Sequence, residues 1–149
     1  MTKPLRSARK AKGSGHFRRA EILAAAERIF LECGYEGATI RKIADAVGVS
    51  STALYMHFRD KNQILVEICE AAFGKLLAQN TEIAALRMDP VARVRLMLDA
   101  YMNFALENAN AYQLIFCSTH PALAEGERES VEALSARCYE LFSGAVAQI

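Results

Sequence analysis

Residues 39–65 read TIRKIADAVGVSSTALYMHFRDKNQIL, and this stretch carries the strongest structural signal in the chain. Its apolar residues recur at steps of three and four, a spacing typical of helices that bury one face. Thr39 and Ser50 stand where N-capping residues are expected, and Gly48 with Val49 leaves room only for a tight turn between two helices. Two short helices joined in this way predict a helix-turn-helix motif.

The helical pattern continues on both sides of this motif. Upstream, Ile22, Phe30 and other apolar residues predict a helix that starts at about residue 16 and ends at Gly34, which suits a left-handed C-cap. Downstream, Asp60 and Gln63 have the spacing of a capping box, so a long fourth helix is expected to start at about Lys61. This fourth helix would connect a three-helix head to the rest of the chain.

The remaining sequence also predicts helices. Asp89 followed by Pro90 marks a helix start, Asn110 is expected to cap a shorter helix, and a break at His120-Pro121 precedes a last helix. The helix after Pro90 is expected to have a broad apolar face made of Val91, Val94, Leu98, Tyr101, Met102 and Ala105. Almost no segment alternates as a half-buried strand does, so the predicted fold class is all-α. We expect a disordered basic arm over residues 1–15, a helix-turn-helix head over 16–66 and a helical body over 67–149.

The charges divide unevenly along the chain. The net charge is only +1, but residues 1–61 carry 12 Lys/Arg against 6 Asp/Glu, a balance of +6, and residues 62–149 carry 6 against 11, a balance of −5. A basic half next to an acidic half favours a polyanionic partner for the first half. A solvated tail that only aids solubility is the alternative for the arm taken by itself.

Several other classes of protein are disfavoured. The four cysteines form no CxxC pair, no metal site is suggested, and the three histidines at 16, 57 and 120 are far apart, so we expect neither an enzyme nor a cofactor. No apolar run reaches the roughly 18 residues that cross a bilayer, and no signal-peptide pattern follows the basic N-terminus. A cytoplasmic location and no membrane partner are therefore expected.

The second helix of the motif has an unusual outer side. Ser51 and Thr52 are small enough to let a helix approach DNA closely, and Tyr55 offers a ring for a thymine methyl group and a hydroxyl for a phosphate. Lys61 adds a cation at a helix N-terminus, and Arg41 on the preceding helix has the forked guanidinium that can read a guanine. These residues are candidates for contacts to double-stranded DNA.

The same run resembles the DNA-binding signature of TetR-like (TetR/AcrR) transcriptional repressors over about residues 16–66. The shared features are a threonine, a basic second helix, G-V-S, L-Y-x-H-F and a lysine at the start of the fourth helix, whereas Ala53 stands where many members have glycine. The resemblance implies that Thr39, Tyr55 and Lys61 contact phosphates and that Arg41, Ser51, Thr52 and Met56 face bases. Ser50, as the cap, and His57, which more often packs or caps than reads bases, complete the DNA-binding set.

In the body, the segment AYQLIF is loosely similar to regulatory domains of this family, which implies a small-molecule effector. The candidate pocket residues are Met97, Tyr101, Phe104, Phe116, Cys117, His120 and Cys138. Aromatic and methionine residues at helical spacing are more often ordinary core, and that alternative stays open for each of them. Family members continue for two further helices that pair across a dimer, so this chain is either truncated or pairs through another surface.

The expected function is that of a homodimeric repressor that binds a palindromic operator and is released from it by a small apolar or amphipathic ligand. The contrasting hypothesis is a truncated helical interaction module that needs a partner and does not bind DNA alone.

Overall fold

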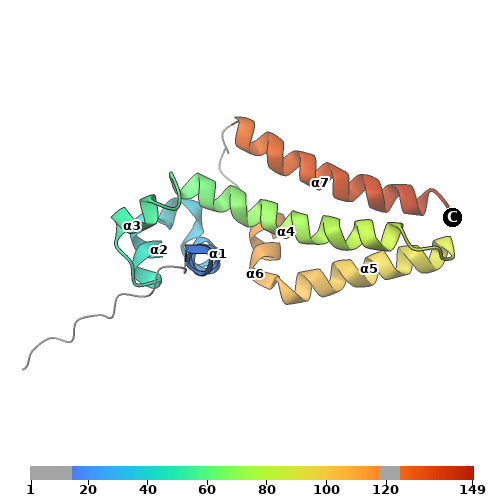
Figure 1. The fold of residues 1–149 in the computed structure, drawn as a ribbon, viewed down its shortest axis with the longest axis horizontal. Coiled ribbons are helices and arrows are strands. Elements are labelled where there is room, and N and C mark those ends of the chain that lie inside the picture. Colours follow the sequence, from blue (N-terminus) through green and yellow to red (C-terminus); the bar gives the residue numbers. More distant parts are fainter. Residues whose placement is uncertain (1–14, 118–124) are drawn as a thin grey trace, which may run out of the picture.

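The computed structural model describes residues 15–117 and 125–149, which are helical throughout apart from short connections (Figure 1). The elements are α1 (Gly15–Gly37), α2 (Ile40–Ala46), α3 (Ser51–Tyr55), α4 (Lys61–Ala84), α5 (Pro90–Glu107), α6 (Ala109–Tyr112), the π-helical turn η1 (Gln113–Cys117) and α7 (Glu125–Val146). The prediction of an all-α fold is confirmed for these residues. Most of the predicted arm, and the predicted break at His120-Pro121, lie outside them.

Figure 1 shows that the long helix α4 runs through both parts of the molecule and that the other helices pack around it. Helices α1 to α3 cluster around its N-terminal end and form the head, while α5 and α7 pack along its C-terminal part, contact each other and form the body. Buried residues make a single core from Ile22 in the head to Cys138 in the body, and α4 supplies much of it, including Leu65 and Phe73. Head and body are therefore joined by a continuous packed helix rather than by a flexible linker.

Local side-chain chemistry sets the helix ends. Four of the five predicted N-caps, namely Thr39, Ser50, Asp60 and Asp89, accept a hydrogen bond from the backbone N–H three residues further on, at 2.8–3.2 Å. Gly34, which interrupts α1, and Gly48, in the turn of the motif, both have φ of 68°, a conformation that favours glycine. The predicted order of helices and turns in the head is thus confirmed.

Two expectations for the body were wrong. Helix α5 buries Met97 and Phe104, whereas Leu98 and Met102 of the expected apolar face are 46% and 57% exposed. The predicted apolar face is therefore not buried as a whole, because Val91, Leu98 and Met102 keep more than two fifths of their surface exposed while α5 packs against α4 and α7.

The start of α6 also differs from the expectation, because Asn110 lies inside that helix. Asn108 occupies the N-cap position without a side-chain capping bond. Its amide instead donates to the Phe104 carbonyl at 3.0 Å and its Oδ1 accepts from Lys75. Helix α6 therefore follows α5 almost immediately, and Asn110 comes too late to cap it.

No helix in the described part of the chain has the length and apolar character needed to cross a membrane.

Candidate nucleic-acid interface and body cavity

Helix α3 presents two different sides. Leu54 is fully buried in the head, while Thr52 is exposed and Tyr55 and Met56 are 56% and 84% exposed. The Ser50 cap fixes where the helix starts and therefore which residues face outward, Ser51 lying partly buried beside them. Short polar side chains at the start of α3 and larger ones at its end are thus displayed on one protruding edge of the head.

Helix α2 adds residues beside this edge. Thr39, the exposed cap of α2, uses its hydroxyl oxygen to accept from the backbone N–H of Lys42. The Arg41 side chain is 86% exposed, and its Nε is 3.9 Å from the Asp45 carboxylate. An ion pair this long and this exposed contributes little to stability, so Arg41 can leave it at small cost to meet another partner.

Lys61 has an internal role that the sequence did not indicate. Its ammonium donates to the carbonyls of Tyr35 at 2.8 Å and Ala38 at 3.3 Å, and it lies 4.1 Å from the centre of the Tyr35 ring. These carbonyls lie at the end of α1, where backbone acceptors lack helical partners and favour a cation. Two of the three N–H donors of Lys61 are therefore engaged within the head.

His57 is half-buried in the turn between α3 and α4, and its backbone carbonyl accepts a hydrogen bond from α1. Arg19 on α1 donates through Nη1 to the His57 carbonyl at 2.7 Å, through Nε to Glu67 at 2.9 Å, and its guanidinium lies 4.2 Å from the centre of the Phe58 ring. The turn that follows α3 is thus fixed to both α1 and α4. Sequence reasoning missed Arg19, because no local pattern relates it to residues 38 and 48 positions away.

The positive charge of the first half is concentrated at its beginning. Five of its 12 Lys/Arg lie in residues 1–14, without any acidic residue, and the remaining seven in residues 15–61 face six Asp/Glu. The described head is therefore almost balanced in charge. Long-range attraction to a polyanion would come mainly from the arm, whereas the head supplies shape and hydrogen-bonding groups.

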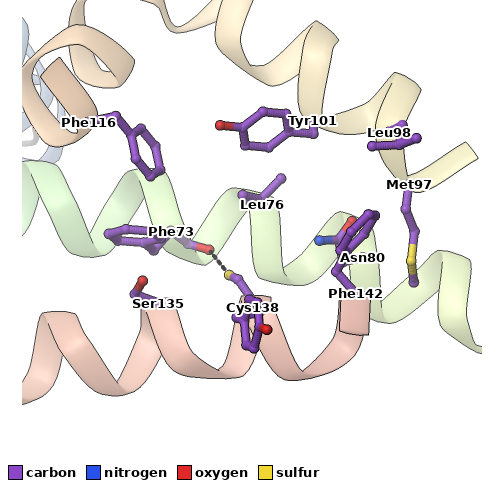
Figure 2. Close-up of a pocket in the computed structure, with 11 residues that line it drawn as sticks. Phe73, Leu76, Asn80, Met97, Leu98, Tyr101, Phe116, Ser135, Cys138 and Phe142 are labelled. Carbon is purple, nitrogen blue, oxygen red and sulfur yellow. Dashed lines mark hydrogen bonds between the residues drawn. The ribbon is translucent and has the colours of Figure 1, made fainter. Parts of the chain in front are cut away.

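The body contains a cavity of about 340 Å³ between α4, α5, η1 and α7 (Figure 2). Four of the seven predicted pocket residues line it, namely Met97, Tyr101, Phe116 and Cys138. Phe104 does not line it, because its ring is buried in the core on another part of α5. The Cys117 side chain and His120 lie outside the described residues.

Sequence reasoning missed the remaining lining residues, which are Phe73, Leu76, Asn80, Leu98, Ser135, Tyr139 and Phe142. Asn80 stands out because its side chain is 5% exposed and its Oδ1 has no hydrogen-bond donor among the described residues. The signal that could have identified it is an asparagine that follows Ala72, Leu76 and Leu77 at helical spacing on α4.

Two other polar groups at the cavity, the Tyr101 hydroxyl and the Cys138 thiol, already have partners. The Tyr101 and Tyr112 hydroxyls are 3.1 Å apart, and the Cys138 thiol donates to the Phe73 carbonyl at 3.7 Å, the contact drawn in Figure 2. Burial raises the pKa of Cys138, only partly offset by Arg137, so the thiol stays protonated at neutral pH. None of the described lining residues is charged.

Polar contacts also connect the head to α7. Arg59, next to the α4 cap, donates through Nη2 to the Glu127 carboxylate at 2.7 Å, and the Ser130 hydroxyl donates to Glu70 at 2.8 Å. The α3–α4 turn is therefore attached to the N-terminal part of α7 as well as to α4.

Within the described residues, no cluster of three or more His, Cys, Asp or Glu side chains could hold a metal ion.

Comparison with known proteins agrees with this geometry. Residues 22–68 match the family model described as bacterial regulatory proteins, tetR family. Over 129 residues the chain is 29% identical to the transcriptional activator FasR of Mycolicibacterium smegmatis, covering 85% of this chain and 59% of FasR. Over 118 residues it is 30% identical to the transcriptional repressor KstR2 of Mycobacterium tuberculosis, covering 79% and 58%. The chain thus spans about three fifths of the length of these curated relatives.

The fold is similar to that of solved regulators. The TetR-family regulator PfmR of Thermus thermophilus superposes with a TM-score of 0.79 at 29% identity, covering 87% of this chain and 69% of PfmR. The similarity extends beyond the head and includes most of the helical body.

Proposed function

We propose that this chain, which belongs to the TetR family of bacterial regulatory proteins, acts as a ligand-responsive regulator that reads operator DNA with α3. The observation that carries the proposal is the protruding edge of the head, where Tyr55 and Met56 are exposed directly after the buried Leu54. A surface that leaves large side chains uncovered beside small polar ones suits insertion into a major groove. The matched family consists of regulators and not of enzymes.

The DNA contacts divide into two groups in this proposal. Thr39, Tyr55 and Lys61 hold phosphates and position the head, whereas Ser51, Thr52 and Met56 on α3 face base edges, with Arg41 on α2 beside them. Thr39, Arg41, Thr52, Tyr55 and Met56 are exposed, which supports their availability for DNA, whereas Ser51 and Lys61 are partly buried. His57 and Ser50 act through the backbone: Ser50 caps α3, and His57 offers its carbonyl to Arg19.

Two heads are needed to read a palindrome, so we propose a two-fold dimer whose recognition helices reach major grooves about 34–36 Å apart. Apolar side chains that this chain exposes on α5 and α7, such as Met102 and Tyr139, support association with another helical surface. The family name does not decide the sign of regulation, because FasR is described as an activator and KstR2 as a repressor. We favour repression that a ligand relieves.

The response to ligand would pass from the body to the head along two routes. A ligand between α4, α5 and α7 would shift α4, which continues without a break into the head. It would also shift α7, which contacts the α3–α4 turn through Glu127 and Arg59. Either movement changes the separation of two heads in a dimer, and binding of ligand and DNA are then coupled.

Selection of bound duplexes from a random pool at near-physiological salt, with the mass of the complex recorded, tests the proposal. An enriched inverted repeat bound by an even number of chains is the expected result. No enrichment, together with tight association to a longer relative such as KstR2, would instead support the interaction module that does not bind DNA alone.

A further inference from the structure

The body cavity contains a polar group that its own fold does not satisfy. Asn80 is the one buried polar or charged residue among those described, and it lies on the cavity side of α4 (Figure 2). Its Oδ1 accepts no hydrogen bond from any described residue. An unsatisfied buried amide reduces the stability of a folded protein, so folding alone gives no reason for an asparagine at this position.

The rest of the cavity lining indicates which chemical class of ligand would fit. The surrounding rings and aliphatic chains, such as Leu76, Met97 and Phe142, are apolar. A charged ligand group would lose its hydration there without meeting an opposite charge on the described lining, which is strongly unfavourable. The hydroxyl of Tyr101 and the thiol of Cys138 already have partners. The hydroxyls of Ser135 and Tyr139 belong to residues that are partly and largely exposed to water, so Asn80 is the buried polar residue that most needs a partner.

We infer that the cavity binds an uncharged amphiphile whose apolar body fills the space between α4, α5 and α7 and whose single hydroxyl donates a hydrogen bond to Asn80 Oδ1. This inference rests on the proposed function, since it specifies the ligand class for the same site. It makes Asn80 the residue that selects a hydrogen-bond donor over an apolar or purely accepting group. Discrimination of this kind is effective because the wrong ligand leaves the buried amide unpaired.

Two isomeric probes isolate the hydrogen bond. 1-Octanol carries a hydroxyl, whereas 1-methoxyheptane has the same atoms but no donor, and octanoate tests an anionic head. We expect isothermal titration calorimetry on the 149-residue chain, without DNA, to show 1-octanol binding about tenfold more tightly than the ether. Octanoate is expected to bind more weakly than 1-octanol at pH 7.

Three variants separate the role of Asn80 from general effects. Asn80→Leu has a similar volume and no polar group, so it should fold and bind both neutral probes with nearly equal affinity. Gln79→Leu changes the neighbouring exposed amide outside the cavity and should keep the tenfold preference. Ser135→Leu adds volume to the lining from α7 and should weaken both neutral probes to the same extent.

Several results would overturn the inference. They are the absence of binding by all three probes, equal binding of the isomers to the unmodified chain, a preference that survives Asn80→Leu, tighter binding of octanoate, and unchanged binding in Ser135→Leu. Because these measurements contain no DNA, they do not depend on operator recognition. A failure to select an operator would contradict the proposed function. The preference for 1-octanol over the ether would still test the ligand inference on its own.

Discussion

Arg19 shows how much of the reading head depends on one side chain. Its guanidinium joins α1 to the His57 carbonyl, the Phe58 ring and Glu67, and its side chain is only one third exposed. Arg19→Met should lower the free energy of unfolding by about 1–3 kcal/mol, since charged hydrogen bonds of a partly buried group are lost. Urea denaturation followed by circular dichroism measures this change.

The neighbouring Arg18 is a matched control for that substitution. Its contacts are long, 3.4 Å to the Val47 carbonyl and 3.9 Å to Glu21. Arg18→Met should therefore stay within about 0.5 kcal/mol of the unmodified chain. Equal losses for the two arginines would show that the contacts of Arg19 do not fix the turn after α3.

Thr52 and Tyr55 should respond differently to substitution if bases and phosphates are contacted by different residues. Thr52→Ala should relax the preference at one operator position by about 1–3 kcal/mol. Tyr55→Phe keeps the exposed ring, loses a hydroxyl, and should weaken binding to all duplexes to a similar extent. Competition with operators substituted one base pair at a time measures both effects, and identical profiles for the two variants would refute this division.

Among the elements, α4 depends on Asp60 for its start. Burial raises the pKa of this carboxyl, but the hydrogen bonds from the Gln63 N–H and the Arg59 side chain outweigh it, so the pKa lies below its ordinary value of 3.8. A pKa that is lower in the folded chain means that the ionised group stabilises the fold above the ordinary value. That contribution is lost as the pH falls through the lower folded-state pKa.

Two substitutions of Asp60 separate the cap from the charge. Asp60→Ala should reduce the free energy of unfolding by about 1 kcal/mol at pH 7, because the N-cap is lost. Asp60→Asn keeps a capping oxygen, so its smaller deficit should disappear between about pH 5 and pH 2 as Asp60 of the unmodified chain becomes protonated. Thermal unfolding across this range tests the sign, and a deficit that grows on acidification would contradict it.

The helix ends of the head could be predicted from the sequence because capping is a local interaction. Thr39, Ser50 and Asp60 each bond to a residue three positions away, so side-chain type and spacing suffice. The body was harder to predict because its contacts depend on how helices cross. Both Met97 and Met102 are apolar residues on α5, yet the first is buried and the second exposed.

The same limit applied to the candidate sites. Met97 and Tyr101 were predicted in the cavity from residue type, but Phe104, of the same kind, faces the core instead. Asn80 was missed because the sequence does not show that α5 and α7 enclose this position of α4. Only that packing buries the single polar residue beside the cavity. Likewise, the contact of Lys61 with the end of α1 follows from tertiary structure and has no local signature.

At the scale of the whole molecule, the head is joined to the body by the continuous helix α4, by packing of α1 against α6 and η1, and by the polar contact between Arg59 and Glu127 of α7. The core passes through α4 without interruption, so a shift of α4 cannot be absorbed within it. The contact between Arg59 and Glu127 is different, because the Arg59 side chain is 70% exposed and can move into solvent without disturbing the core, although this leaves the Glu127 side chain, which is 18% exposed, without its partner. It is therefore suited to exist in one regulatory state and not in the other.

Glu127→Gln tests whether this contact carries part of the coupling between ligand and DNA. The substitution preserves size but removes the charge that faces the guanidinium of Arg59. If the contact differs between the ligand-bound and DNA-bound states, the ratio of operator affinities without and with a selected effector should change about two- to fivefold. Operator titrations monitored by fluorescence anisotropy give that ratio, with Arg128→Gln, an exposed neighbour on α7, as the control. By linkage, the effector must show the same change in its affinity for the DNA-bound and free protein. A ratio unchanged in Glu127→Gln would mean that the contact between Arg59 and Glu127 does not transmit the response.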